Sequence, residues 1–221
     1  MKFKNEDVTF LGWLDNVWYH YKAAIIISAF ALVILVVGMT QMITREEHDV
    51  FIYCVGEQGL TAQATDMFTS EMQSCFTVDA NNDGKKVVDL KFDTFVMTED
   101  VNGKHHVYNP SEQLSIIERF NLELASGECV VYIMEPSFFA ANLDYLASFE
   151  EELSFVPEKA IYGKGIKLSD LVSYKATTTL SYFPEDYVIC LADHENRFYD
   201  EYYKGNVKFL ENLIKYNLVK Q

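Results

Sequence analysis

Residues 110–149 read PSEQLSIIERFNLELASGECVVYIMEPSFFAANLDYLASF. The first part opens with Pro-Ser-Glu and closes at Gly127, which are start and stop signals for a helix over residues 110–128. Residues 129–134, CVVYIM, form a short apolar run rich in β-branched residues, which predicts a strand. Residues 136–149 predict a further helix. The stretch therefore contains a helix, a strand and a helix in succession.

The same alternation precedes this stretch. Residues 49–56, DVFIYCVG, are a short β-rich run and predict a strand, and residues 60–76 have apolar side chains at helical spacing. Residues 86–97 predict a second strand, and residues 98–109 carry turn chemistry and predict a loop. Three strand–helix pairs in a row indicate right-handed crossovers. The sequence thus predicts an α/β fold, a three-layer domain with a mostly parallel sheet.

The last part of the chain is less regular. Residues 165–171, GIKLSDL, predict a loop that leads into a short turn. Residues 177–183 and 186–193 predict two strands, which a hairpin across Pro184 would join. Residues 203–219 have apolar side chains on one helical face and predict a closing helix.

Two short motifs in this pattern resemble those of a known family. A helix that ends in Ser126-Gly127-Glu128 leads into a strand, then a helix, and later an Asp170-Leu171 turn. This succession resembles the first lobe of the extracellular solute-binding proteins of ABC importers.

The resemblance covers residues 49–171 and 186–217, and the closing run GNVKFLENLIKYN is similar to a late helix of that family. It implies an outer domain like a single solute-binding-protein lobe. The second lobe is missing, so the resemblance implies half of the fold and no ligand-binding residues. More broadly, the chain resembles single-span proteins of Gram-positive-type bacteria that carry a W-Y-x-Y-K collar before the span.

Residues 23–43, AAIIISAFALVILVVGMTQMI, form a long run without a charge. At about 1.5 Å per residue, a helix of this length spans about 30 Å, the hydrocarbon thickness of a bilayer. The run is longer than the apolar region of a secretion signal, and no small-x-small cleavage pattern follows it. Residues 23–43 are therefore predicted to be an uncleaved transmembrane helix.

The positive charges near the span predict its orientation. Lys2, Lys4 and Lys22 precede it, whereas Arg45 follows it. Positively charged flanks stay on the cytoplasmic side. We expect a single-pass protein of the cell membrane with a cytoplasmic N-terminus and an extracellular C-terminal domain.

The charge divides the chain into an interfacial segment, residues 1–22, and an acidic outer domain, residues 44–221. The first segment carries as many lysines as acids, so the formal net charge of −15 belongs to the rest of the chain. This charge argues against binding to nucleic acid, which needs a basic surface to neutralise phosphates.

Aromatic residues form a predicted collar before the membrane span. Trp13, Trp18, Tyr19, Tyr21 and Lys22 lie in an amphipathic stretch just ahead of it. Rings with a polar tip suit the headgroup region of a bilayer. We interpret these residues as a membrane anchor.

The segment DANNDG, residues 79–84, has the first six residues of a calcium loop. Asp79, Asn81 and Asp83 would be ligands, together with the carbonyl oxygen of Lys85. The twelfth position should be a bidentate acid but is Leu90. The alternative is a plain turn, because Asx side chains and a glycine satisfy such a connection without a metal. The sequence favours the turn and leaves calcium as a possible cofactor.

The chain has four cysteines, Cys54, Cys75, Cys129 and Cys190. An oxidising exterior would permit two disulfides. Three of the cysteines fall in predicted core strands, where a thiol packs as a small hydrophobic group. We therefore favour buried thiols. The spacing has no CxxC motif, so neither zinc nor a redox pair is indicated.

The sequence contains no nucleophile elbow, phosphate-binding loop, dinucleotide-binding glycine motif or HExxH motif, so we expect no catalytic activity. The leading hypothesis is a membrane-anchored extracytoplasmic module that binds a protein partner or an envelope component through loops at the carboxyl ends of its strands. The alternative is a small-ligand receptor or an accessory component of a membrane transporter, with its site at the switch point of the sheet.

Overall fold

The computed structural model describes residues 10–43, 47–95, 98–99, 106–107, 114–193, 200–216 and 218, and it gives no side-chain description for residues 10–16, 41–43, 98–99, 106–107 and 200. The chain divides into two compact units, residues 1–46 and residues 47–221. Each unit is described by itself.

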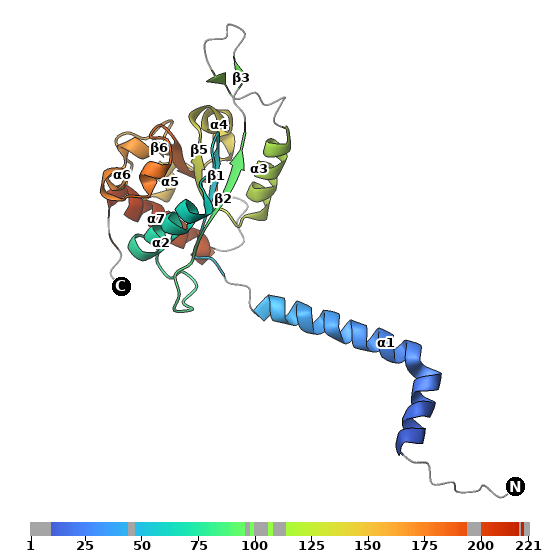
Figure 1. The fold of residues 1–221 in the computed structure, drawn as a ribbon. Helices are drawn as coiled ribbons and strands as arrows, with labels where there is room; N and C mark the ends of the chain where they lie inside the picture. Colours follow the sequence, from blue (N-terminus) through green and yellow to red (C-terminus); the bar gives the residue numbers. More distant parts are fainter. Residues whose placement is uncertain are drawn as a thin grey trace, which may run out of the picture. The chain divides into compact units, whose positions relative to one another are not determined.

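The described part of the first unit is one long helix, α1 (Phe10–Ile43). Its segment Val17–Thr40 is long and apolar enough to cross a membrane. Figure 1 draws α1 as a long helical ribbon. The hydroxyl of Thr40 donates to the carbonyl of Val36 one turn earlier, so this polar group is satisfied within the helix. The N-terminal apolar helix predicted from residues 23–43 is therefore present.

The second unit is built on a five-stranded sheet in the order β2-β1-β5-β7-β6. The strands are β1 (Val50–Gly56), β2 (Val88–Thr94), β5 (Val131–Met134), β6 (Gly165–Lys167) and β7 (Val188–Leu191). Strand β1 pairs in parallel with β2 and β5, whereas β7 runs antiparallel to β5 and β6. The predicted α/β class and mostly parallel sheet are confirmed.

Helices cover both faces of this sheet. The main ones are α2 (Ala62–Cys75), α3 (Leu114–Ser126), α4 (Pro136–Ala141) and α7 (Asp200–Lys215). Side chains of α2 and α7 share one hydrophobic core with the sheet, and side chains of α3 and α4 share the other. The domain therefore has three layers.

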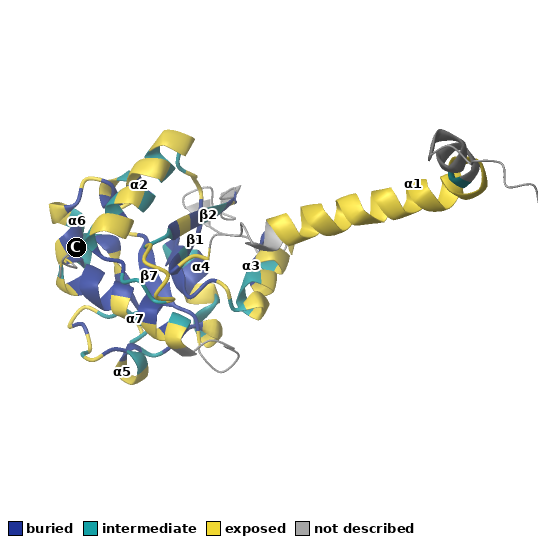
Figure 2. Ribbon diagram, turned by 90° about the horizontal axis from the view of Figure 1, so that it is seen from below, coloured by how far each residue is buried: buried dark blue, intermediate teal, exposed yellow. Residues whose placement is uncertain are grey.

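Strand β1 shows why the sheet is covered on both faces. Ile52 and Cys54 point into the core beneath α2 and α7, whereas Tyr53 and Val55 point into the core beneath α3 and α4. All four are at most 1% exposed, and Figure 2 colours the central strands as buried. Successive side chains of a strand point to opposite faces, so an unbroken apolar run requires a layer on each side.

The stop signal of α3 is confirmed. Gly127 follows the helix with φ of 70°, a left-handed conformation that glycine adopts without strain. The predicted start of this helix at Pro110 lies outside the described residues. The closing helix is present as α7, with bounds earlier than the predicted residues 203–219.

The sequence predicts a loop over residues 98–109, but this segment also contains strand. Two short strands, β3 (Thr98–Glu99) and β4 (His106–Val107), pair antiparallel with Thr98 opposite Val107. Pairing between the backbone groups of two short strands needs no apolar pattern, which is why the composition did not indicate it.

The single helix predicted over residues 136–149 is wrong. The structure has α4, then a 3-10 turn η1 (Leu143–Tyr145), then α5 (Phe149–Glu152). The extended backbone between them pairs with the end of β7. Leu146 forms a bridge with Ala192, and the N–H of Ala147 donates to the carbonyl of Leu191 at 2.9 Å. This sheet pairing interrupts a segment that has helical composition.

The strand predicted over residues 177–183 is also wrong. This segment contains the 3-10 turn η3 (Leu180–Tyr182) after the short helix α6 (Val172–Ala176). No hairpin forms across Pro184 in this described part of the chain, because β7 pairs with β5 and β6 instead.

Residues 165–171 begin with a strand, β6, rather than with the predicted loop. The turn predicted after it is present as η2 (Leu168–Asp170). Strand β6 is the outer neighbour of β7 and completes the sheet at the edge opposite β2.

Candidate functional site

The switch point of the sheet lies between β1 and β5. The connection from β1 to β2 runs through α2 on one face, and the connection from β2 to β5 runs through α3 on the other. Ligands of open α/β sheets bind outside the carboxyl ends of the strands at such a point. Here those ends are Gly56 and Met134.

The side chain of Tyr187 occupies this switch point. Tyr187 directly precedes β7, is 4% exposed, and accepts a hydrogen bond at its hydroxyl from the N–H of Glu57 at 2.9 Å. Its ring lies so close to Gly56 that a Cβ on residue 56 would be 2.2 Å from the Tyr187 hydroxyl oxygen. Glycine is therefore required at position 56, and the ring fills the space that a ligand would take.

The Tyr187 hydroxyl is a neutral phenol at physiological pH. Burial raises its pKa to about 12, although the hydrogen bond from the Glu57 backbone acts in the opposite direction. The hydroxyl accepts the Glu57 amide, so the buried side chain, which we call the Tyr187 plug, is held over Gly56.

Glu135 follows β5 at the same edge of the sheet and caps α4. Its carboxylate accepts from the N–H of Ser137 at 2.8 Å and of Phe138 at 2.9 Å, and also from the Ser137 hydroxyl. A carboxylate at a helix N-terminus satisfies amides that have no partner within the helix. Glu135 is 8% exposed, so its negative charge is held in place by the helix.

A second buried acid joins β1, β2 and α3. Asp93 accepts a hydrogen bond from the Tyr53 hydroxyl, and its Oδ2 lies 3.3 Å from Nε of Arg119. Burial, and then the neighbouring Asp93, raise the pKa of Tyr53 far above its ordinary value. Lys91 and Glu123 form an ion pair between the same strand and helix. These contacts fix α3 on the sheet.

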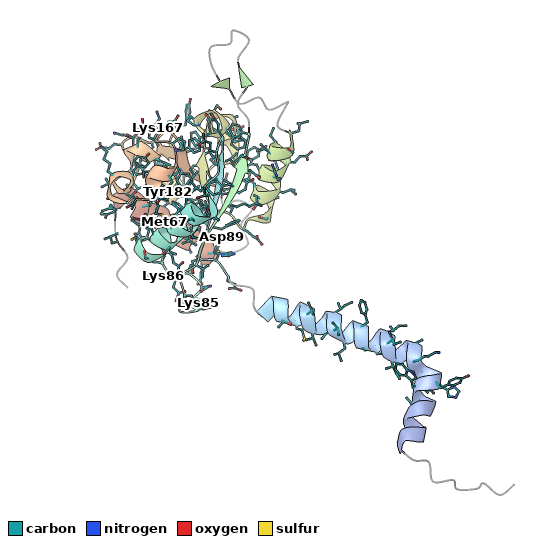
Figure 3. All side chains as sticks on the ribbon, viewed as in Figure 1. Met67, Lys85, Lys86, Asp89, Lys167 and Tyr182 are labelled. Atoms are coloured by element: carbon teal, nitrogen blue, oxygen red, sulfur yellow. The ribbon has the colours of Figure 1, made fainter. Side chains whose placement is uncertain are left out.

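An open depression lies on the outer side of α2, with a volume of about 650 Å³. One wall is α2 and the other is the segment before η3. The residues that line it are Gln63, Asp66, Met67, Ser70, Glu71, Ser74, Cys75, Thr178 and Thr179. We call this depression the α2 groove. Met67 and Tyr182 lie at its side, with the Tyr182 hydroxyl 3.8 Å from the Met67 sulfur (Figure 3).

Sequence reasoning did not identify the residues of the α2 groove. Glu71 and Asp66 are ordinary polar positions of an amphipathic helix, and Thr178 lay in a predicted strand. The groove exists because a segment about a hundred residues later folds back onto α2, which no local pattern indicates.

The DANNDG segment forms a compact turn. The carboxylate of Asp79 accepts from the N–H of Gly84 at 3.0 Å, the side-chain oxygen of Asn81 from Asp83, and the carboxylate of Asp83 from Lys85. Gly84 has φ of 83°, as the sharp turn requires. These hydrogen bonds account for the residue types of the segment without a metal.

One oxygen of the turn stands apart, because Oδ1 of Asp79 is buried and has no hydrogen-bond partner. Across the described part of the chain, no group of three or more His, Cys, Asp or Glu side chains is arranged to hold a metal ion. The calcium site at Asp79, Asn81, Asp83 and Lys85 stays a prediction.

The collar residues lie on α1. Trp18, Tyr19 and Tyr21 are more than half exposed, and Lys22 is exposed beside them. The side chain of Trp13 lies outside the described residues. Their role as a membrane anchor stays a prediction.

None of the four cysteines, all of which lie in the described residues, forms a disulfide, and three of them are buried, as predicted. Cys54, Cys129 and Cys190 are completely buried in the strands and their flanks, whereas Cys75 at the end of α2 is partly exposed. Burial raises the pKa of the Cys54 thiol well above its ordinary value, which keeps it protonated and unreactive.

Comparisons with protein-family models, curated proteins and solved structures find no match to this chain. The predicted likeness to one lobe of solute-binding proteins is therefore untested. The geometry of the chain itself carries the functional argument.

Proposed function

We propose that this protein is a membrane-anchored extracytoplasmic module that binds a protein partner and has no catalytic activity. The observation that carries this proposal is the position of Tyr187 over Gly56. The ring closes the point at which an α/β sheet of this topology would hold a small ligand. The carboxyl edge of the sheet is then a surface rather than a pocket, and surfaces bind macromolecules.

The apolar helix supports the anchored part of the proposal. Segment Val17–Thr40 is long and apolar enough to span a membrane. The distribution of lysines around it favours a cytoplasmic N-terminus and an outer domain of residues 47–221. In this arrangement the sheet domain presents its surface near the outer side of the membrane.

The second candidate is a small-ligand receptor or an accessory component of a transporter. The α2 groove favours it, because 650 Å³ falls within the usual range of ligand sites, about 300–1,000 Å³. A solute-binding-like half-fold would also suit an accessory component. We rank it second because the groove is open and lies on a helix, away from the switch point.

Site-specific photocrosslinking of the full chain in intact native membranes tests the leading proposal. Lys167 is exposed at the carboxyl edge of the sheet, where the N–H of the next residue, Leu168, donates to the carbonyl of Tyr187 at 2.8 Å. Lys85 is exposed in the turn after α2, and the two lie at opposite ends of the domain (Figure 3). The same photoreactive amino acid replaces Lys167 in one variant and Lys85 in the other, so the two variants form a matched pair.

A discrete protein adduct at Lys167 but not at Lys85 is the expected result. If Lys167 gives no protein adduct, and neither do exposed positions on α2 and α3, the interaction module is excluded. If a small molecule co-purifies with the chain and no protein adduct forms, the small-ligand receptor is established instead.

A further inference from the structure

One face of helix α2 forms one wall of the α2 groove. Gln63, Asp66, Met67, Ser70 and Ser74 stand at positions i, i+3, i+4, i+7 and i+11, so they line one stripe of the helix. The stripe faces away from the sheet, because the buried residues of α2 are Phe68 and Met72. The groove thus runs along the helix and is open on its outer side.

The opposite wall of the groove is held in place by Glu71. Its carboxylate accepts from the N–H of Thr178 at 3.3 Å and from the N–H and the hydroxyl of Thr179, the former at 3.0 Å. Hydrogen bonds to a charged acceptor are stronger than those between neutral groups. The wall is therefore formed before any partner arrives.

The chemistry of the groove is acidic and partly apolar. Its charged side chains are Asp66 and Glu71, and none of the nine residues that line it is basic. Met67 contributes a polarizable side chain that is 46% exposed. Lysine and arginine match such a surface, because an apolar stem can lie on a methionine while the cationic head reaches a carboxylate.

We propose that the α2 groove binds a basic, extended peptide segment of the protein partner. The inference rests on the proposed interaction function and adds a second contact surface, together with the charge of the partner segment that it takes. The open length of the groove suits an extended segment. The formal net charge of −15 attracts a cationic chain toward the domain from a distance.

Cys75 supplies a natural reporter of occupancy. It lines the groove and is the partly exposed cysteine, whereas the other three are completely buried. The full chain is placed in nanodiscs of phosphatidylcholine, whose zwitterionic surface does not attract the probe. The rate at which N-ethylmaleimide modifies Cys75 is then measured by mass spectrometry, with and without a synthetic peptide that alternates lysine and serine.

We expect the basic peptide to slow modification of Cys75 about tenfold when it is present at about ten times its dissociation constant, by mass action. A peptide of equal length that alternates glutamate and serine leaves the rate unchanged. In the Asp66→Asn variant, the basic peptide binds about two- to fivefold more weakly, the range for an exposed charge pair. Asp66 is exposed, so this change leaves the fold intact.

Asp144→Asn is the matched control. Asp144 is also exposed, but it lies in η1, beside the core on the opposite face of the sheet. Equal weakening in the two variants shows non-specific charge attraction and overturns the proposal, as does an unchanged Cys75 rate at millimolar basic peptide. Crosslinking at Lys167 can still succeed in that case, so failure of the groove is distinct from failure of the interaction function.

Discussion

Asp49 holds Ala80 at the start of the turn before β2. The carboxylate of Asp49 accepts the N–H of Ala80 at 2.7 Å with one oxygen, and the N–H of Val87 at 2.8 Å with the other. Asp49 is 1% exposed, so the acceptor of both bonds is buried. A single buried acid thereby fixes both ends of the turn that contains DANNDG.

Asp49→Ala is expected to lower the free energy of unfolding by about 2–4 kcal/mol, because it leaves two backbone amides without their acceptor. The measurement is urea unfolding of the full chain in detergent, followed by circular dichroism. Asp144→Asn, an exposed change, is the control and shifts stability by less than about 0.5 kcal/mol. Equal stability of Asp49→Ala and the wild type would show that the two bonds contribute nothing.

Gly56→Ala is expected to destabilise the domain by about 1–3 kcal/mol, since the new methyl group meets the Tyr187 ring. In a Tyr187→Ala background the same change costs less, because the space is free. Urea unfolding of the two single variants and the double variant gives the coupling between the residues. Additive effects would mean that Tyr187 does not fill the switch point in solution.

Millimolar calcium is expected to leave the melting temperature of the chain unchanged relative to chelator. The reason is that Asp79, Asn81 and Asp83 already accept backbone hydrogen bonds, and Leu90 stands where a bidentate acid is needed. Thermal unfolding with and without calcium checks this. A rise that disappears in Asp79→Asn would instead establish the metal site and give Oδ1 of Asp79 a partner.

We expect the contribution of Glu211 to the free energy of unfolding to be lost in acid. Burial acts to raise its pKa, but hydrogen bonds from Ser154 and Lys208 outweigh burial and hold the pKa below its ordinary value. A depressed native pKa gives stability that is present above the unfolded pKa, about 4.3, and lost as the pH falls through the native value.

The variant Glu211→Gln isolates this contribution. The stability difference between wild type and Glu211→Gln is expected to be largest at neutral pH and to shrink below about pH 4. Unfolding in urea at a series of pH values measures it. A difference that stays constant with pH would show that the charge of Glu211 is not involved.

The partial exposure of Cys75 leads to a prediction for maleimide labelling of the thiols and provides a test of the side of the membrane on which the domain lies. A maleimide should modify one thiol in the native chain and four after denaturation, because three thiols are buried. In intact cells a membrane-impermeant maleimide should reach Cys75 from outside. Labelling only after the cells are broken would place the domain in the cytoplasm and reverse the proposed orientation.

The sequence pattern predicted the central sheet well because buried strands carry their own signal. The runs at Val50–Gly56 and Val131–Met134 are apolar at every position, and they lie in the middle of the sheet. Gly127 likewise marked a helix end through its own backbone preference. Such features depend on a few neighbouring residues.

The errors arose where distant residues override local preference. The threonines of residues 177–179 favour a strand, but the Glu71 carboxylate takes two amides of this run. The helix expected over residues 136–149 breaks where Ala147 pairs with Leu191. The α2 groove and the Tyr187 plug are made of such long-range contacts, which periodicity and composition cannot indicate.

Helix α7 has a consequence for biosynthesis. Asn206, completely buried, donates to the carbonyl of Asp49 at 3.1 Å across a separation of 157 residues, and Asn212 donates to the carbonyl of Phe76. At a synthesis rate of about 5–20 residues per second, the first strand waits about 8–30 s for this partner. Until then the core beneath α2 lacks the cover that α7 provides. Such a nascent chain depends on chaperones until α7 has emerged, and a ribosome that stalls before α7 releases a product destined for proteolysis.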